Sequence, residues 1–213
     1  HFSFNWSFGN NVNYGSSQTK GSGVVKQESR AVANFSRLVL ALPATVTLTQ
    51  GPAESLTISA DDNLLPLMTT RVAGDELIIE GDNSHGFSTR NAIKVRLTVK
   101  TLNAITIKGS GDVFGDQFRS DKLDISIAGS GDVKLKSIRA DQVKIGIEGS
   151  GDISVDAIDS KLVDASIQGS GDIRLPSLQS SWVKISVNGS GDISAAGNTD
   201  KVDVEIMGSG DVR

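Results

Sequence analysis

The sequence predicts an all-β fold, a right-handed parallel β-helix whose coils contain about 20 residues. The tetrapeptide Gly-Ser-Gly-Asp occurs six times, with four intervals of 20 residues and a last interval of 19. Apolar residues recur at the same positions of every repeat, and the segments between tetrapeptides alternate between apolar and polar residues, as strands do. About 20 residues are too few for a strand, a helix and a return strand, so each repeat is one solenoid coil. Crossovers between parallel strands are right-handed in nearly all proteins.

Residues 1–20 precede the solenoid. They are polar apart from a few aromatic residues, and they begin with the alternating run FSFNWSF after His1. This pattern predicts either a strand that docks on a neighbour or a disordered leader.

Residues 21–107 lack the tetrapeptide but have β character. Strands are expected at 35–42, 44–50, 54–59, 75–82, 93–100 and 104–109, with a hairpin turn at 73–76 and an exposed loop at 81–91. The segment 61–68 favours a short helical turn capped by Asp61 or Asp62. His85 is expected to be an ordinary loop histidine. Because the last of these strands leads directly into the first tetrapeptide, we expect one continuous solenoid with irregular first coils.

Residues 108–213 form the regular part of the predicted solenoid. One inward column contains Ile125, Ile145, Ala165, Ile185 and Val204, and similar apolar columns flank it. A single coil buries too little apolar surface to offset the entropy lost on ordering its chain, so the coils must stack. Pro176 interrupts a strand and predicts a bend.

The tetrapeptide is expected to form a corner between two strands. Its first and third positions are Gly109, Gly111, Gly129, Gly131, Gly149, Gly151, Gly169, Gly171, Gly189, Gly191, Gly208 and Gly210. Glycine reaches backbone angles that are closed to other residues, and Asp and Ser can bond to nearby backbone N–H groups. A phosphate-binding loop is not supported, because the Walker motif needs Lys followed by Ser or Thr and the dinucleotide motif needs a third glycine. Serine catalysis is poorly supported, because both histidines lie outside the tetrapeptides and a base would have to reach the corner from elsewhere.

Stacking places the aspartates of the tetrapeptides in one column, Asp112, Asp132, Asp152, Asp172, Asp192 and Asp211. Their mutual repulsion can be offset by backbone N–H donors or by bound calcium. One carboxylate per coil supplies few of the roughly six to eight oxygen atoms that calcium requires. We therefore expect a capping role, with calcium as the less favoured alternative and no other metal or cofactor.

Two outward columns alternate in charge and predict a solvated face. They are Asp124, Lys144, Asp164, Lys184 and Asp203, and Asp116, Lys136 and Asp156. Trp182 is expected to be partly exposed and to pack over a corner, and a ligand role for it is less favoured.

The composition excludes several classes of protein. With 21 Lys and Arg against 25 Asp and Glu, the net charge of −4 does not favour nucleic acid as a partner. The absence of cysteine excludes disulfides, thiolate metal sites and a cysteine nucleophile. The longest apolar run, residues 38–42, is far shorter than the roughly 18 residues of a membrane span. The first residue, His1, predicts a processed or trimmed N-terminus, such as one left by a signal peptide.

The ordered series VVKQESRAVANFSRLVLALPATVTLTQG, ESLTISADDNLLPLM, DELIIEGD and serial GSGD resembles the head GIN domain family of auto-transporter adhesins. The likeness covers residues 21–213. It implies a bacterial, exported β-helical domain in the periplasm, on the outer surface or outside the cell, and it brings no catalytic residues with it.

The first functional hypothesis is a non-catalytic adhesion or interaction module of the cell envelope or secretome, with a protein or glycan as its surface ligand. The second is a polysaccharide-active enzyme, which needs clustered carboxylates, or a basic residue beside bound metal, in one groove, whereas the acids here are spread along the repeats. The third is a small-ligand or lipid carrier with a pocket around Leu64, Leu65, Leu67 and Met68.

The last strand, residues 202–207, is expected to present an unpaired edge, which is a template for pairing with another chain. Self-association through this edge or through the aromatic leader is the favoured expectation, and a monomer capped by its own tail is the alternative.

Overall fold

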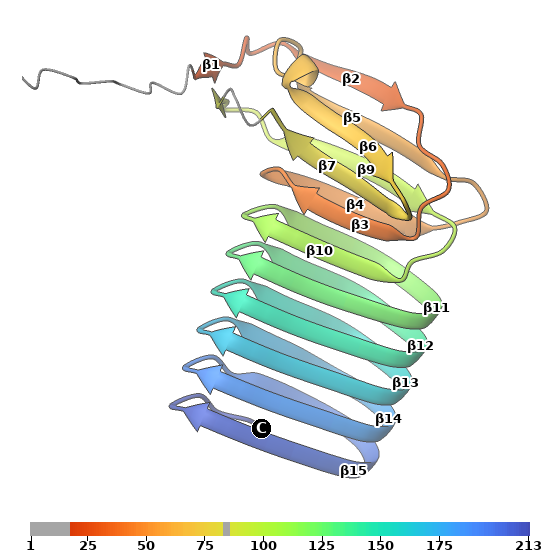
Figure 1. Ribbon diagram of the computed structural model, residues 1–213, viewed down its shortest axis with the longest axis vertical. Coiled ribbons are helices and arrows are strands. Elements are labelled where there is room, and N and C mark those ends of the chain that lie inside the picture. The colour runs from red at the N-terminus through yellow and green to blue at the C-terminus, as the bar shows by residue number, and fades with distance from the viewer. Residues whose placement is uncertain (1–17, 83–85) are drawn as a thin grey trace, which may run out of the picture.

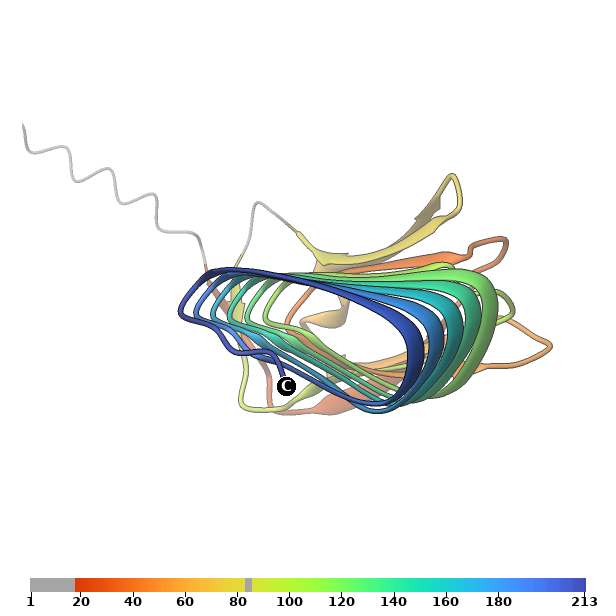
Figure 2. The ribbon, with the colours of Figure 1, turned by 90° about the horizontal axis from the view of Figure 1, so that it is seen from below.

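The computed structural model describes residues 18–82 and 86–213, and it confirms the right-handed parallel β-helix (Figures 1 and 2). The aromatic run near the start of the chain and His85 lie outside these residues. Each coil is a flattened loop with two faces. In the first regular coil these are an outgoing face at 113–118 and a return face at 123–129. A tetrapeptide corner joins the faces at one end and a bend at 119–122, here called the turn edge, joins them at the other.

Five strands of the regular part each extend around a whole coil. They are β11 (Asp112–Gly129), β12 (Asp132–Gly149), β13 (Asp152–Gly169), β14 (Asp172–Gly189) and β15 (Ile193–Gly208). Neighbouring coils pair in parallel, with Ile125 opposite Ile145 and Ile145 opposite Ala165. The residues of each apolar column in the sequence are therefore paired with one another in the sheet.

The last coil is one residue shorter than the others, and β14 absorbs the difference. The register between β14 and β15 shifts between Leu175 and Leu178, so that Leu175 lies opposite Ala195 and Leu178 opposite Gly197. Pro176 lies in this irregular stretch. A residue without an N–H group fits a place where the ladder is interrupted.

The spatial order of the N-terminal strands differs from their order in the chain. The strand β10 (Ala104–Gly109) continues the return face, and β3 (Arg37–Ala41) pairs in parallel on its far side, followed by β7 (Glu76–Gly81). On the outgoing face, β4 (Ala44–Gln50) pairs with β11 and then with β9 (Ile93–Val99). The β3–β4 layer thus lies between the regular coils and the β7–β9 layer, although it comes first in the chain.

Antiparallel strands close the N-terminal end of the stack (Figure 1). The strand β6 (Met68–Ala73) forms a hairpin with β7, and β5 (Ser55–Asp61) pairs with β9 and with β2 (Val25–Arg30). A 3₁₀ turn, η1 (Leu65–Leu67), lies between β5 and β6. The carbonyl oxygens of Leu65 in this turn and of Met68, which follows it, accept hydrogen bonds from Arg30. The short strands β1 (Thr19–Lys20) and β8 (Phe87–Ser88) pair beside this cap.

The expected helix cap at Asp61 or Asp62 is wrong. Leu64 precedes the 3₁₀ turn, and no side chain caps it. Asp61 is instead buried, and its carboxylate accepts hydrogen bonds from Asn91 Nδ2 at 2.9 Å, Thr89 Oγ1 at 3.1 Å and the Gly23 N–H at 3.3 Å. These donors come from two separate segments, so Asp61 joins the N-terminal segment to the loop after β8.

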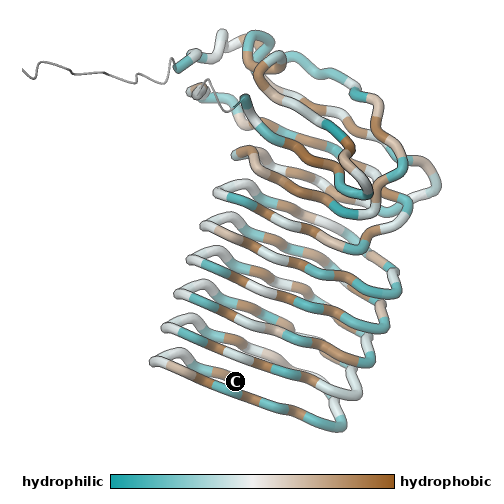
Figure 3. The backbone as a smooth tube through the Cα atoms, in the orientation of Figure 1, coloured by the Kyte–Doolittle hydropathy of each residue, from teal (hydrophilic) through white to brown (hydrophobic). Residues whose placement is uncertain are grey.

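The core occupies the interior of the whole stack. Apolar and polar residues alternate along each coil (Figure 3), and the apolar ones form one continuous buried cluster from Phe35 to Ile193. The expected hairpin turn at 73–76 is present between β6 and β7.

Candidate functional site along the turn edge

The first glycine of each tetrapeptide needs its special backbone angle. Gly149 has φ +120°, and the other first glycines lie between +107° and +137°. The Gly149 carbonyl accepts hydrogen bonds from both the Ser170 and the Gly171 N–H groups of the next coil. The corner therefore joins adjacent coils as well as reversing the chain.

The third glycine is needed for a different reason from the expected one. Gly111, Gly131, Gly151, Gly171, Gly191 and Gly210 are not among the glycines with positive φ. A Cβ atom on Gly151 would lie 2.1 Å from the Gly131 carbonyl oxygen. Glycine is required here because the backbones of successive coils approach so closely.

The tetrapeptide aspartates form a ladder. The N–H of Asp152 donates to Asp132 Oδ1 at 3.1 Å, and the N–H of Asp172 donates to Asp152 Oδ1 at 3.0 Å. The same contact links Asp112 to Asp132, Asp172 to Asp192 and Asp192 to Asp211. Each bonded carboxylate is thus partnered by a backbone N–H group. Within the described ranges, no group of three or more His, Cys, Asp or Glu side chains is placed to hold a metal ion.

The outward charge columns pair less regularly than their alternation suggests. Lys136 Nζ lies 3.4 Å from Asp116. Lys184, by contrast, lies over the Trp182 ring at 4.2 Å from its centroid, and Lys201 lies 4.5 Å from the same centroid. Trp182 Nε1 donates to Asp203 at 2.7 Å. Its ring is therefore already in contact with two ammonium groups, which leaves it a poor stacking platform for a ligand.

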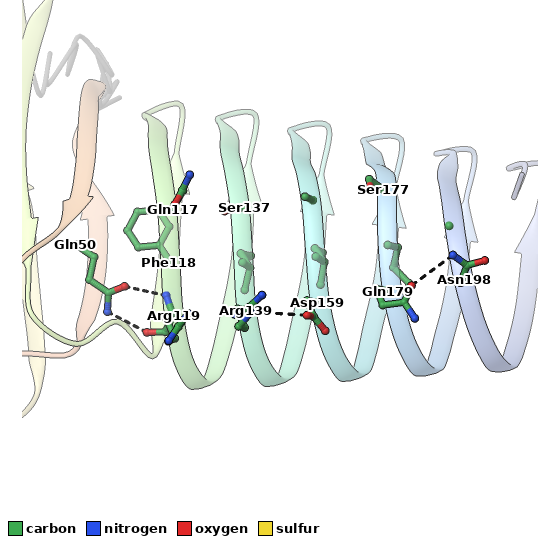
Figure 4. A pocket seen from close by; sticks show the side chains of 15 residues that line it. Gln50, Gln117, Phe118, Arg119, Ser137, Arg139, Asp159, Ser177, Gln179 and Asn198 are labelled. Atoms are coloured by element: carbon green, nitrogen blue, oxygen red, sulfur yellow. Dashed lines mark hydrogen bonds and ion pairs between the residues drawn. The ribbon is translucent and has the colours of Figure 1, made fainter.

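A row of polar side chains follows the turn edge from coil to coil. The row, called the ridge below, consists of Arg119, Arg139, Asp159, Gln179 and Asn198, all exposed (Figure 4). Every member ends in a planar guanidinium, carboxylate or amide group. Arg139 and Asp159 form an ion pair at 3.7 Å, and Asn198 donates to Gln179 at 3.4 Å.

Two open grooves flank the ridge. The first, of about 600 Å³, lies on the outgoing-face side and is lined by Gln117, Ser137, Ala157 and Ser177 as well as the ridge. The second, of about 730 Å³, lies on the return-face side and contains Ser120, Ser160, Ser180 and Thr199. Beneath the ridge, Phe118, Ile138, Ile158 and Leu178 are buried in the core. The exposed surface of this edge is therefore mostly polar.

Hydroxyl groups shape the turn edge. Ser180 Oγ donates to the Trp182 carbonyl at 3.0 Å and lies 3.2 Å from the Lys161 carbonyl of the preceding coil. Ser160 makes the equivalent contacts with Leu162 and Asp141. A serine that bonds two residues ahead stabilises a local turn. These bonds hold the ridge side chains on a defined backbone.

Gln50 completes the ladder where the first regular coil lacks a neighbour. Its side-chain Oε1 accepts from the Arg119 N–H at 2.8 Å, and Nε2 donates to the Arg119 carbonyl at 3.0 Å (Figure 4). A side-chain amide thus takes the place of a peptide group. This contact fixes the first member of the ridge.

The ridge is not among the sites predicted from the sequence. The signal was present, since Arg119, Arg139, Asp159 and Gln179 each follow a tetrapeptide aspartate by seven residues, and Asn198 follows one by six. The ridge does not alternate in charge, however, whereas the two outward columns named above do. Of the residues around which an apolar pocket is expected, Leu64, Leu65 and Met68 are buried in the core and Leu67 is partly buried against it. No helix among the described residues is long and apolar enough to cross a bilayer.

Comparison with solved structures supports the fold. A protein from Bacteroides fragilis described as a "putative adhesin" is 24% identical, with 91% of this chain and 98% of that chain covered and a TM-score of 0.73. A "putative lipid binding protein" from Parabacteroides distasonis is 22% identical, with coverages of 92% and 98% and a TM-score of 0.69. A "putative adhesin" from Parabacteroides merdae is 18% identical, with the same coverages and a TM-score of 0.60.

A search of the curated proteins finds no match. A family model described as "Putative auto-transporter adhesin, head GIN domain" matches residues 34–213. This range contains the β3–β4 layer, most of the antiparallel cap and every tetrapeptide corner. The chain belongs to this head GIN domain family.

Proposed function

We propose that this protein is an exported, non-catalytic interaction module that binds a surface ligand, a protein or a glycan, along its turn edge. The observation that carries the proposal is the ridge with its two flanking grooves. The ridge extends over five successive coils and presents a polar side chain at each of them. A long, shallow and polar surface suits adhesion to an extended partner.

The arrangement of charged groups favours binding over catalysis. Hydrolysis of a glycosidic bond needs two carboxyl groups facing one another across the bond, one of them with a raised pKa. Asp159 is the only carboxylate of the ridge, and Arg139 pairs with it at 3.7 Å. One ridge carboxylate cannot fill both roles.

The family name and the names of the similar structures support an exported adhesin, and the compartment we propose is the periplasm, the outer surface or the extracellular space. One similar structure is described as a lipid-binding protein. Lipid binding is the less favoured function for this chain, because the apolar side chains beneath the ridge are buried.

We also propose that the protein associates with itself through the outer edge of β15. Among the described strands, β15 pairs along its length only with β14. The C-terminal residues 211–213 cover its outer edge only at Ile193 and Ala195, which leaves the part from Val202 onward unpaired among the described residues. Its apolar residues Val202, Val204 and Ile206 are 52%, 49% and 43% exposed. An exposed apolar edge strand is a template for another strand.

A binding array that carries both glycans and immobilised bacterial surface proteins tests the main proposal. The same glycans are incubated with the protein in a reducing-sugar assay. Binding without release of reducing ends supports the proposal, and turnover of any polysaccharide would overturn it. The double variant Arg119→Ala, Gln179→Ala should lose the binding, since Arg119 has no described ion pair and its backbone is held by Gln50.

A further inference from the structure

We infer that the ridge takes a neutral, extended polyhydroxylated chain, an uncharged glycan, lying along the solenoid axis. The inference rests on the proposed function and specifies the ligand class. Three features of the turn edge lead to it: the shape of the ridge side chains, the charge balance of the grooves and the pairing of the strands beneath.

The ridge presents paired hydrogen-bonding atoms at regular intervals. Guanidinium and amide groups supply donors, and carboxylate and amide groups supply acceptors, each as two atoms side by side. Two neighbouring hydroxyl groups of a sugar offer a matching pair. Successive members are separated by one strand spacing, so the five members span about 19 Å along the axis.

The charged side chains around the ridge are three positive and four negative. Arg119, Arg139 and Lys161 stand against Asp121, Asp141, Asp159 and Asp200 in the two grooves. Lys161 pairs with Asp141 at 3.7 Å, as Arg139 does with Asp159. A polyanion such as a uronate polymer would therefore meet no surplus of positive charge.

The backbone beneath the ridge disfavours a peptide as the ligand. A peptide strand binds by pairing with a free sheet edge. Here β12, β13 and β14 are each paired with a strand on both sides. The grooves are lined by serine, alanine, amide and charged side chains. The apolar residues that also line the first groove are at most 5% exposed, so few apolar pockets are open to peptide side chains; they are Phe118, Ile138, Ile158 and Leu178.

The test is calorimetric titration of the full chain with neutral cello-, manno- and xylo-oligosaccharides of increasing length, and with polygalacturonate. We expect at least one neutral series to bind, with affinity rising with length until the oligomer spans about 19 Å and staying constant beyond that. Gln179→Ala should weaken binding about tenfold, the effect of losing one or two hydrogen bonds. Gln168→Ala, an exposed glutamine on the return face, is the matched control and should change nothing.

The outcomes separate this inference from the proposed function. If no neutral series binds, or if polygalacturonate binds more tightly, the ligand class is overturned. The proposed function is still supported after that result if an array ligand of another class binds the protein and Gln179→Ala weakens the binding of that ligand. If a neutral glycan binds but Gln179→Ala and Gln168→Ala behave alike, the ridge is overturned as the binding surface.

Discussion

The two ends of the solenoid are built on the same core but finished differently. At the N-terminal end, Leu64, Leu65 and Met68 are at most 4% exposed beneath the antiparallel strands of the cap. At the C-terminal end, Val204 is 49% exposed, whereas Ile185, its counterpart one coil earlier, is 6% exposed. An apolar hollow of about 380 Å³ opens there between Val183, Ile185 and Val204.

The difference shows that a repeated coil does not bury its own apolar residues. Each coil is covered by the next, so an end of the stack is protected only where the chain departs from the repeat. The irregular half covers the N-terminal end of the stack with antiparallel strands. β5 pairs on one face and β6 on the other, and η1 lies between them. The following predictions test this contrast, from the largest expected effect to the smallest.

Gly151→Val should destabilise the protein most, because it disrupts the contact between coils in the middle of the stack, away from both ends. A Cβ atom would lie 2.1 Å from the Gly131 carbonyl, where backbone cannot yield, so we expect a loss of more than about 4 kcal/mol. Chemical denaturation followed by circular dichroism measures it. Gly146→Ala is the control, because its Cβ would lie 3.6 Å from Ser166 Oγ and should be tolerated. Equal stability of the two variants would contradict the close-approach argument.

Leu64→Ala and Val204→Ala compare the two ends directly. The first removes a fully buried side chain from the cap and should cost about 2–5 kcal/mol. The second shortens a half-exposed side chain and should cost about 0.8 kcal/mol or less. The free energies of unfolding come from the same denaturation experiment. Similar losses at both sites would mean that the C-terminal end is covered in solution.

Self-association should depend on the open end. Light scattering of the full chain and of a chain beginning at Gly21 should give a mass that rises with concentration in both. Val204→Lys should restore the monomer, since a lysine pointing into an edge discourages pairing. Phe114→Lys replaces an apolar residue of similar exposure, 41%, away from the edge and should leave association unchanged. Monomers at high concentration in every sample would end the proposal.

Asp61 should make the capped end sensitive to acid. The hydrogen bond from Asn91, aided by those from Gly23 and Thr89, holds the pKa of Asp61 below its ordinary 3.8 despite the opposing effect of burial. A carboxyl whose pKa is lower in the folded state stabilises it above the unfolded pKa, and loses this effect as pH falls through the folded pKa. Urea midpoints should show Asp61→Asn less stable than wild type near neutral pH, with the difference shrinking below pH 3.8. A difference independent of pH would exclude this origin.

Asp152→Asn should have the smallest effect. An amide oxygen can accept the Asp172 N–H as the carboxylate does, and the change also removes repulsion within the column. We expect a shift below about 1 kcal/mol. Calcium chloride should produce neither heat in a titration nor a rise in melting temperature. An unfolded Asp152→Asn variant would contradict the capping role.

The structure of the regular half could be predicted from the sequence because each coil pairs with a coil of nearly the same sequence pattern. The interval between Ile125 and Ile145 is both a repeat length and a sheet register, so periodicity alone places them side by side. The irregular half has no such period. The pairing of β3 with β10 joins segments far apart in the chain, and no local pattern indicates that β7 lies beyond them. The ridge was missed because its members share a planar end group but neither charge nor size.

The third glycine also has a consequence for how such a protein can change in length. Because Gly131 and Gly151 let each corner sit directly on the one before, every regular coil offers its neighbours the same upper and lower contact surface. A whole coil can then be gained or lost by duplication or deletion without a new interface having to arise. A change of one residue, in contrast, requires an irregularity such as the one beside Pro176. The length of the ridge along the turn edge is therefore set by the number of repeats that the gene encodes.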